Sequence, residues 1–148
     1  PDEICGFYWL LAQLKKLPSF IERRREHFDF LKRELAPVSD RLILPEACPN
    51  SKPSWFGFMM TCQNGLSRAT VVSALESRNI QTRMLFAGNL IKHPCFDELR
   101  ASKTGYRAIG ELPNTDRIMN DSFWVGVYPG LTEEMLGEIA RVIRSAAK

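Results

Sequence analysis

The sequence lacks closely spaced cysteines and long hydrophobic runs, and these absences exclude several classes of protein. Cys5, Cys48, Cys62 and Cys95 lie dozens of residues apart, so no pair has the spacing of a zinc ribbon or a redox dithiol. We expect four reduced, structural thiols. The longest apolar run, residues 4–12, is far shorter than the roughly 20 residues that cross a bilayer.

A secretion signal and a strongly one-sided charge are also missing. No basic leader precedes the apolar run and no small-residue cleavage site follows it, so we expect a cytoplasmic protein. The net charge is +3 with both signs mixed along 148 residues, which requires neither nucleic acid nor a membrane as partner. With 45% hydrophobic and 25% charged residues, the chain should fold as one globular domain that buries about two-thirds of its unfolded surface.

The only basic cluster is Arg23, Arg24 and Arg25, flanked by Glu22 and Glu26. A run of this kind is either a nucleic-acid-binding stripe or the solvated face of a helix with local ion pairs. No interleaved aromatic residues or nucleic-acid motif accompany it. We therefore interpret the cluster as a solvated helix face.

Hydrophobic spacing predicts an α+β fold in which helices cover a sheet of about three strands. Apolar residues recur at three- and four-residue steps over residues 7–17 and 19–35, which predicts a long N-terminal helical region that Pro18 bends or restarts. Strands are expected at residues 55–62, 80–86 and 123–128, the first covered on both faces. Residues 36–53 carry four prolines and should form an irregular connector, and residues 90–111 should be loop with a helical turn near 96–101. We divide the chain into linker helices at 1–36 and a small α/β domain at 37–148.

Side chains that can cap helices indicate where three helices begin. Asn114 or Thr115 can cap a short helix through Met119, because a side-chain oxygen can accept a hydrogen bond from a free backbone N–H. Ser67 can cap a helix that ends near residue 77 in the same way. Thr132 can cap the C-terminal helix, whose first turn is acidic and complements the helix dipole.

The stretch from residue 112 to residue 136, LPNTDRIMNDSFWVGVYPGLTEEML, resembles the C-terminal end of one enzyme family. This is the DegT-type branch of the fold-type I pyridoxal-phosphate enzymes, which act on nucleotide-linked sugars. Within the branch, the sequence is most similar to the CDP-4-keto-6-deoxyglucose 3-dehydrases of lipopolysaccharide biosynthesis. The resemblance covers roughly nine-tenths of the chain, and its main segments are residues 12–27, 40–46, 53–58 and 80–89. Residues 1–11 depart from the family pattern.

The resemblance implies the small domain of the fold-type I aminotransferase fold, without the domain that holds the coenzyme. In the family, the coenzyme's lysine, or the histidine that replaces it in the dehydrases, lies in the large domain together with the phosphate site and the dehydrases' iron–sulfur cysteines. We therefore assign no catalytic, cofactor-binding or metal-binding residue here. PLP or PMP is implied only for full-length relatives, and His27 and His93 are expected at the surface.

The small domain of these relatives closes over the sugar nucleotide, and residues 82–89 are the best candidate for that contact. Arg83 can pair with a phosphate, Phe86 can pack on a sugar or base, and Asn89 can bind hydroxyl groups. For Phe86 the alternative is a place in the core, and for Arg83 a structural ion pair.

Three functions are compatible with the sequence. The chain can be the C-terminal domain of a PLP/PMP-dependent nucleotide-sugar dehydrase or aminotransferase, inactive alone. It can also be a freestanding interaction or dimerisation module, or a small sugar-nucleotide-binding protein. The N-terminal helix carries Phe7, Trp9, Leu10, Leu11 and Leu14, and exposing each large side chain costs about 1.5–3 kcal/mol. We therefore expect a homo-oligomer through this helix, with a full-length relative or a cofactor domain as the alternative partner.

Overall fold

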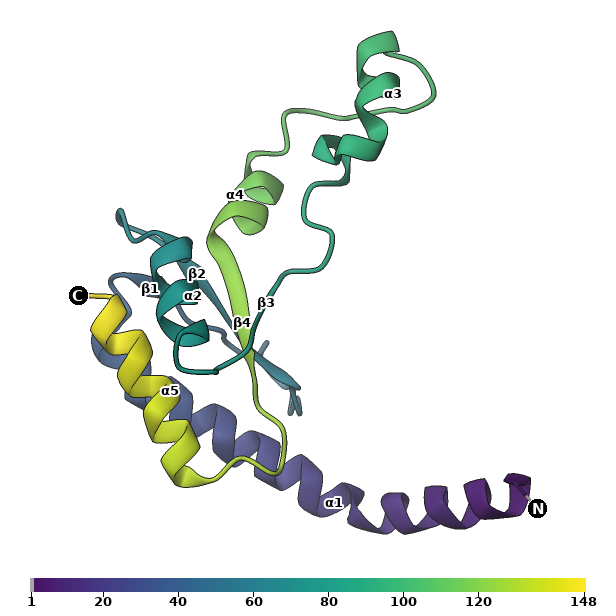
Figure 1. The fold of residues 1–148 in the computed structure, drawn as a ribbon, viewed down its shortest axis with the longest axis vertical. Coiled ribbons are helices and arrows are strands. Elements are labelled where there is room, and N and C mark those ends of the chain that lie inside the picture. Colours follow the sequence, from purple (N-terminus) through teal and green to yellow (C-terminus); the bar gives the residue numbers. More distant parts are fainter. Residues whose placement is uncertain (1) are drawn as a thin grey trace.

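The computed structural model describes residues 2–148, with side chains described from residue 8 onward. The side chains of Cys5 and Phe7 lie outside this described part. One sheet forms the centre of the fold, and three helices pack against it and against one another, as Figure 1 shows. A long excursion of the chain carries a further short helix away from the sheet (Figure 1).

The N-terminal helical region is one continuous helix, α1 (Asp2–Leu35). Pro18 lies inside it, so the predicted restart does not occur, and Figure 1 shows the helix axis changing direction in its purple N-terminal half. The Ser19 hydroxyl donates a hydrogen bond to the Lys16 carbonyl at 2.7 Å. Despite its length of 34 residues, neither α1 nor another helix of the described residues is apolar enough over a sufficient length to cross a membrane.

The sheet has four antiparallel strands, one more than the sequence predicted. They are β1 (Leu42–Ile43), β2 (Gly57–Cys62), β3 (Thr82–Met84) and β4 (Ser122–Gly126), in the spatial order β1-β2-β4-β3. The three predicted strands are confirmed in shortened form. The additional strand β1 lies in the stretch that we expected to be irregular, and it pairs with the end of β2 through Leu42 and Cys62.

Only one face of the sheet is covered by helices, which corrects the expectation that residues 55–62 are buried on both sides. Along β2, Phe58, Met60 and Cys62 are buried, whereas Met59 between them is 39% exposed. A strand's side chains alternate between the two faces, so the exposed positions mark a second, open face. Residues 55–62 are almost wholly apolar, so the sequence could not show that one face of this strand is open. The packing of the helices determines which face is covered.

The helices on the covered face are α1, α2 (Arg68–Glu76) and α5 (Glu133–Ala146). Leu31 and Leu35 of α1 are fully buried in the same core as the sheet; the predicted division at residue 36 stays a prediction. Thr132 caps α5 as expected, because its Oγ1 accepts a hydrogen bond from the Met135 amide at 3.2 Å. Ser67 occupies the N-cap position of α2 without a side-chain hydrogen bond.

Residues 85–112 form an arm that leaves the sheet after β3 and returns to it through α4 (Pro113–Asp121). The arm contains the 3₁₀ turns η2 (Leu90–Lys92) and η3 (Pro94–Phe96) and the helix α3 (Asp97–Ser102), which agrees with the turn expected near residues 96–101. The predicted caps Asn114 and Thr115 are wrong, because α4 begins at Pro113 with Leu112 at the N-cap and no side-chain cap. A proline suits this first helical position, since its missing N–H would have no partner there.

Candidate functional site

The open face of the sheet centres on Trp124 of β4. Trp124 lies between Met59 of β2 and Arg83 of β3, which are its register partners on the two neighbouring strands. Phe56 packs edge-on against the indole, with ring centroids 5.2 Å apart. The indole also covers Gly57, where an added Cβ would lie only 2.6 Å from a ring atom. Glycine at position 57 therefore lets the tryptophan lie flat across β2.

Two grooves flank Trp124, and each is lined by one of the predicted ligand-binding residues Arg83 and Phe86. The first has a volume of about 430 Å³ and is lined by Glu46, Phe56 and Phe86, among others. The second, of about 900 Å³, is lined by Arg83 together with residues that lead into α5. These volumes fall in or near the range of small-molecule sites, roughly 300–1,000 Å³. The open face can thus hold a polar ligand of moderate size against an aromatic centre.

Arg83 and Phe86 are both available to a ligand, but they lie in different grooves. The Arg83 side chain is exposed and makes no hydrogen bond or ion pair within the described residues. Phe86 is 78% exposed, so the alternative of a core position is wrong. Its backbone has φ +43°, a conformation that non-glycine residues rarely adopt. The strained turn after β3 presents an aromatic ring to solvent at the rim of the open face.

Asn89 holds the base of the arm. It is only 3% exposed, its Nδ2 donates to Asp116 Oδ1 at 2.8 Å, and its Oδ1 accepts from the Ile91 amide at 3.2 Å. Lys92 Nζ lies 2.6 Å from the other Asp116 oxygen. The hydrogen bonds from Lys92 and then Asn89 lower the pKa of Asp116 below its usual 3.8. A sugar contact by Asn89 stays a prediction, while its observed bonds tie η2 to α4.

The two histidines have different environments. His27 is 4% exposed with Nδ1 3.1 Å from the Tyr128 carbonyl oxygen, so the prediction of a surface position is wrong for it. It is buried because α1 runs under the loop that follows β4. His93 is half-buried in the arm and its Nε2 contacts the Ala87 carbonyl.

The described cysteines are free: Cys62 is buried, and Cys48 and Cys95 are exposed. Burial, reinforced by the negative charge of Asp121, raises the pKa of the Cys62 thiol to about 11. This thiol therefore stays protonated and packs as a small apolar side chain. The described residues contain no cluster of three or more side chains suited to a metal ion.

The lysines do not form a site for an aldehyde coenzyme. Every described lysine is at least partly exposed, Lys92 is held by Asp116, and Lys32 faces Glu46 at 3.7 Å. A Schiff-base lysine instead needs a depressed pKa, a phosphate cradle and an acidic partner for the ring nitrogen. The residues present do not fit this group.

The open face was only partly visible in the sequence. Arg83 and Phe86 were found because they end a strand, whereas Trp124 and Phe56 were assigned to strands and not to a site. The signal that could have revealed them is Gly57, a glycine inside an apolar strand, because such a glycine often marks a close approach by another group.

The chain belongs to the DegT/DnrJ/EryC1/StrS aminotransferase family, whose model matches residues 8–144. This confirms the resemblance inferred from the sequence. The chain is 48% identical over 134 residues to the lipopolysaccharide biosynthesis protein RfbH of Salmonella typhimurium, covering 89% of this chain and 29% of that protein. It is 43% identical over 135 residues to dTDP-4-dehydro-2,6-dideoxy-D-glucose 3-dehydratase of Saccharopolyspora spinosa, covering 90% of this chain and 28% of the relative.

Solved structures of the family have the same fold. The GDP-4-keto-6-deoxy-D-mannose-3-dehydratase of E. coli with bound hydrated PLP aligns with a TM-score of 0.74 at 24% identity, covering 90% of this chain and 33% of that one. The S. venezuelae DesV structure aligns with a TM-score of 0.76 at 21% identity, covering 94% and 35%. The chain therefore has the fold of about one third of such an enzyme.

Proposed function

We propose that the chain is the C-terminal small domain of a PLP/PMP-dependent dehydratase or aminotransferase for nucleotide-linked deoxysugars, working in the cytoplasm in surface-polysaccharide synthesis. The observation that supports this is the family match over residues 8–144, together with 48% identity to a lipopolysaccharide biosynthesis protein. The lysines do not fit the coenzyme, so the groups that bind and use it belong to a further domain. Alone, these 148 residues have no catalytic activity.

The part of this chain in the reaction is to bind and enclose the sugar nucleotide. Arg83 offers an unpaired guanidinium beside Trp124, which suits a phosphate of the nucleotide. Phe86 stands at the rim of the other groove, where its ring can cover a sugar face and keep water out. Asn89 fixes the segment through Asp116, and it is the third residue that we assign to substrate binding.

A chimeric enzyme tests this function directly. Residues 8–144 replace the matching C-terminal segment of the Saccharopolyspora 3-dehydratase, and loss of dTDP-4-dehydro-2,6-dideoxy-D-glucose is followed. We expect a folded chimera that retains activity, because the two segments are 43% identical. A chimera that folds and binds coenzyme without turning over substrate would show that the chain does not serve as this domain.

Substitutions in the chimera then test the open face. Arg83→Ala and Phe86→Ala should lower kcat/KM about tenfold, roughly 1.4 kcal/mol of lost transition-state binding. Arg117→Ala and Ile109→Ala are matched controls, since both residues are exposed and lie away from the two grooves. If the control and test substitutions lower kcat/KM equally, Arg83 and Phe86 do not bind the substrate.

A second candidate function is that of a freestanding interaction module. The observation that favours it is the first half of α1, where Tyr8, Trp9, Leu10 and Leu14 are all more than half exposed. This half projects beyond the sheet and the other helices (Figure 1). We propose that a second copy of the chain, through its own α1, covers this surface, or that a full-length relative does so.

A further inference from the structure

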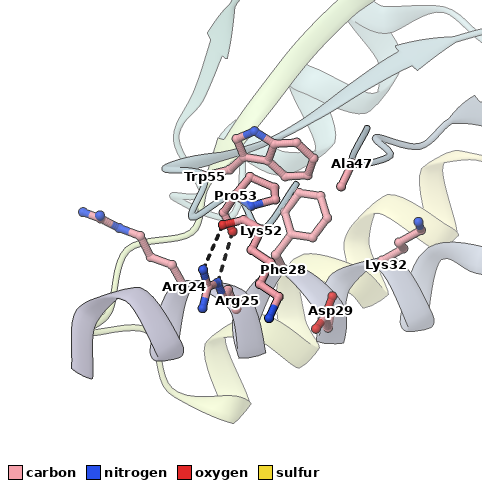
Figure 2. Close-up of a pocket in the computed structure, with 9 residues that line it drawn as sticks. All are labelled: Arg24, Arg25, Phe28, Asp29, Lys32, Ala47, Lys52, Pro53 and Trp55. Atoms are coloured by element: carbon pink, nitrogen blue, oxygen red, sulfur yellow. Dashed lines mark hydrogen bonds between the residues drawn. The ribbon is translucent and has the colours of Figure 1, made fainter. Parts of the chain in front are cut away.

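A further groove lies between α1 and residues 47–55. It has a volume of about 270 Å³ and is lined by Phe28, Asp29 and Lys32 of α1 and by Ala47, Lys52 and Trp55 of the connector, together with Pro53 and two arginines. Figure 2 shows the rings of Phe28 and Trp55 next to each other at this groove. The two ring centroids are 4.5 Å apart and the ring planes are tilted by 49°.

The wall of the groove is held in place by Arg25. Its Nη2 donates to the Lys52 carbonyl at 2.8 Å and its Nε to the Pro53 carbonyl at 3.3 Å, the two bonds drawn in Figure 2. Glu22 pairs with the same guanidinium at 3.0 Å. Arg25 is thus occupied with the backbone, and the connector is fixed against α1. A preformed wall lowers the ordering cost of binding a ligand.

The charge around the groove is mainly positive. Four of its lining side chains are cationic, and Asp29 is the single carboxylate. Lys52 makes no ion pair within the described part of the chain, and Lys32 meets only Glu46, at 3.7 Å. Figure 2 shows the Arg24 guanidinium pointing away from the rings. The amines available to a ligand are therefore those of Lys32 and Lys52, beside an aromatic wall.

We propose that this groove binds a phosphate monoester carried on a flat ring, such as a nucleoside monophosphate. Lysine ammonium groups bind phosphate as point charges, and the ring stacks on Trp55. Phe28 is 8% exposed and supports Trp55 from the core. The groove contains neither Arg83 nor Phe86, although Trp55 also lines the groove that holds Phe86. The proposal does not depend on the function proposed for the open face of the sheet.

Calorimetric titration of the 148-residue chain with adenosine monophosphate, inorganic phosphate and adenosine tests the proposal. We expect the nucleotide to bind with a dissociation constant of about 1 mM or below, and both fragments to bind at least tenfold more weakly. No binding of the nucleotide overturns the proposal. Equal binding of inorganic phosphate also overturns it, because the ring would then contribute nothing.

Charge variants locate the binding. Lys52→Glu should weaken nucleotide binding about tenfold, whereas Asp29→Asn should tighten it severalfold by removing the one carboxylate that lines the groove. Both residues are exposed, so the fold should tolerate the changes, and circular dichroism checks this. Lys103→Glu, in the arm, makes the same charge change as Lys52→Glu and should leave the affinity unaltered. If Lys52→Glu and Lys103→Glu act alike, or if Asp29→Asn weakens binding, the site is not this groove.

Discussion

At the scale of single residues, the arm depends on a contact that only glycine allows. Gly88 has φ +63°, and a Cβ there would lie 2.5 Å from Met119 Cγ of α4. The Asn89 amide next to it donates to Met119 Sδ at 3.3 Å. The contact joins the start of the arm to the helix at its end, so the two ends of the arm are held together.

Replacing Gly88 by alanine should therefore destabilise the protein. The left-handed backbone alone costs an L-residue about 1–2 kcal/mol, and the displaced Met119 adds roughly a further 1 kcal/mol. Gly110→Ala is the matched control, because Gly110 has φ +73° but no atom within 4 Å of an added Cβ. Urea denaturation measures both variants. Equal losses of unfolding free energy at the two positions would contradict the role of the Met119 contact.

The carboxylate of Asp116 makes the base of the arm sensitive to acid. Its pKa is lowered by Lys92 and Asn89 below the usual 3.8, so the folded state binds this proton more weakly than the unfolded state. The stabilisation is present above pH 3.8 and is lost as the pH falls through the lowered value. Asp116→Asn should therefore cost stability at neutral pH and progressively less as the pH falls below 3.8, as measured by denaturation across this range. A difference from the unmodified chain that does not depend on pH would contradict this account.

At the scale of elements, the C-terminal helix begins at a side chain that accepts a hydrogen bond from an amide of its first turn. Thr132 caps α5 through Met135, and Glu133 and Glu134 follow in the first turn. Thr132→Ala should lower the free energy of unfolding by about 1 kcal/mol, while Ser67→Ala should cost less, because Ser67 makes no side-chain bond to α2. Thermal or chemical denaturation compares the two. A larger loss of unfolding free energy for Ser67→Ala than for Thr132→Ala would contradict this prediction.

At the scale of the whole molecule, the two halves of α1 face different surroundings. Leu31 and Leu35 are fully buried, whereas Trp9, Leu10 and Leu14 are 66%, 52% and 52% exposed. An apolar surface of this kind commonly marks an interface, and symmetric pairing of two copies is the commonest arrangement. We therefore expect the chain to associate with itself through residues 8–17.

Light scattering at about 100 μM, well above a typical micromolar dissociation constant, should find an oligomer. Changing Leu10, Leu11 and Leu14 together to glutamate should produce a monomer or an aggregate. Lys15→Glu with Lys16→Glu is the control, since it alters charge on the same helix at polar exposed positions. A monomeric unmodified chain would rule out the pairing.

The chain should also fail to hold pyridoxal phosphate as an internal aldimine. All described lysines are partly or fully exposed, and none has the surroundings that a Schiff base needs. Mixing the protein with the coenzyme and recording the visible spectrum checks this. A stoichiometric aldimine band that borohydride traps would contradict the prediction and place coenzyme chemistry within these residues.

The sequence by itself determined the features that depend on neighbouring residues or on a long match. The spacing of hydrophobic residues predicted α1, α2, α5 and the three longer strands. Thr132 was predicted as a helix cap, and residues 112–136 indicated the family. Helices, strands and caps are recognised from the spacing of neighbouring side chains, so a few residues around each position are enough to predict them.

Only the tertiary structure decided which surfaces face each other. It showed that one sheet face is open, that β1 pairs with β2, and that Trp124 lies between Met59 and Arg83. It also buried His27 under the loop after β4 and joined Asn89 to Asp116. These contacts join residues far apart in the chain, and those between strands follow from strand order and register. An apolar strand has the same local pattern whether one or both of its faces are covered.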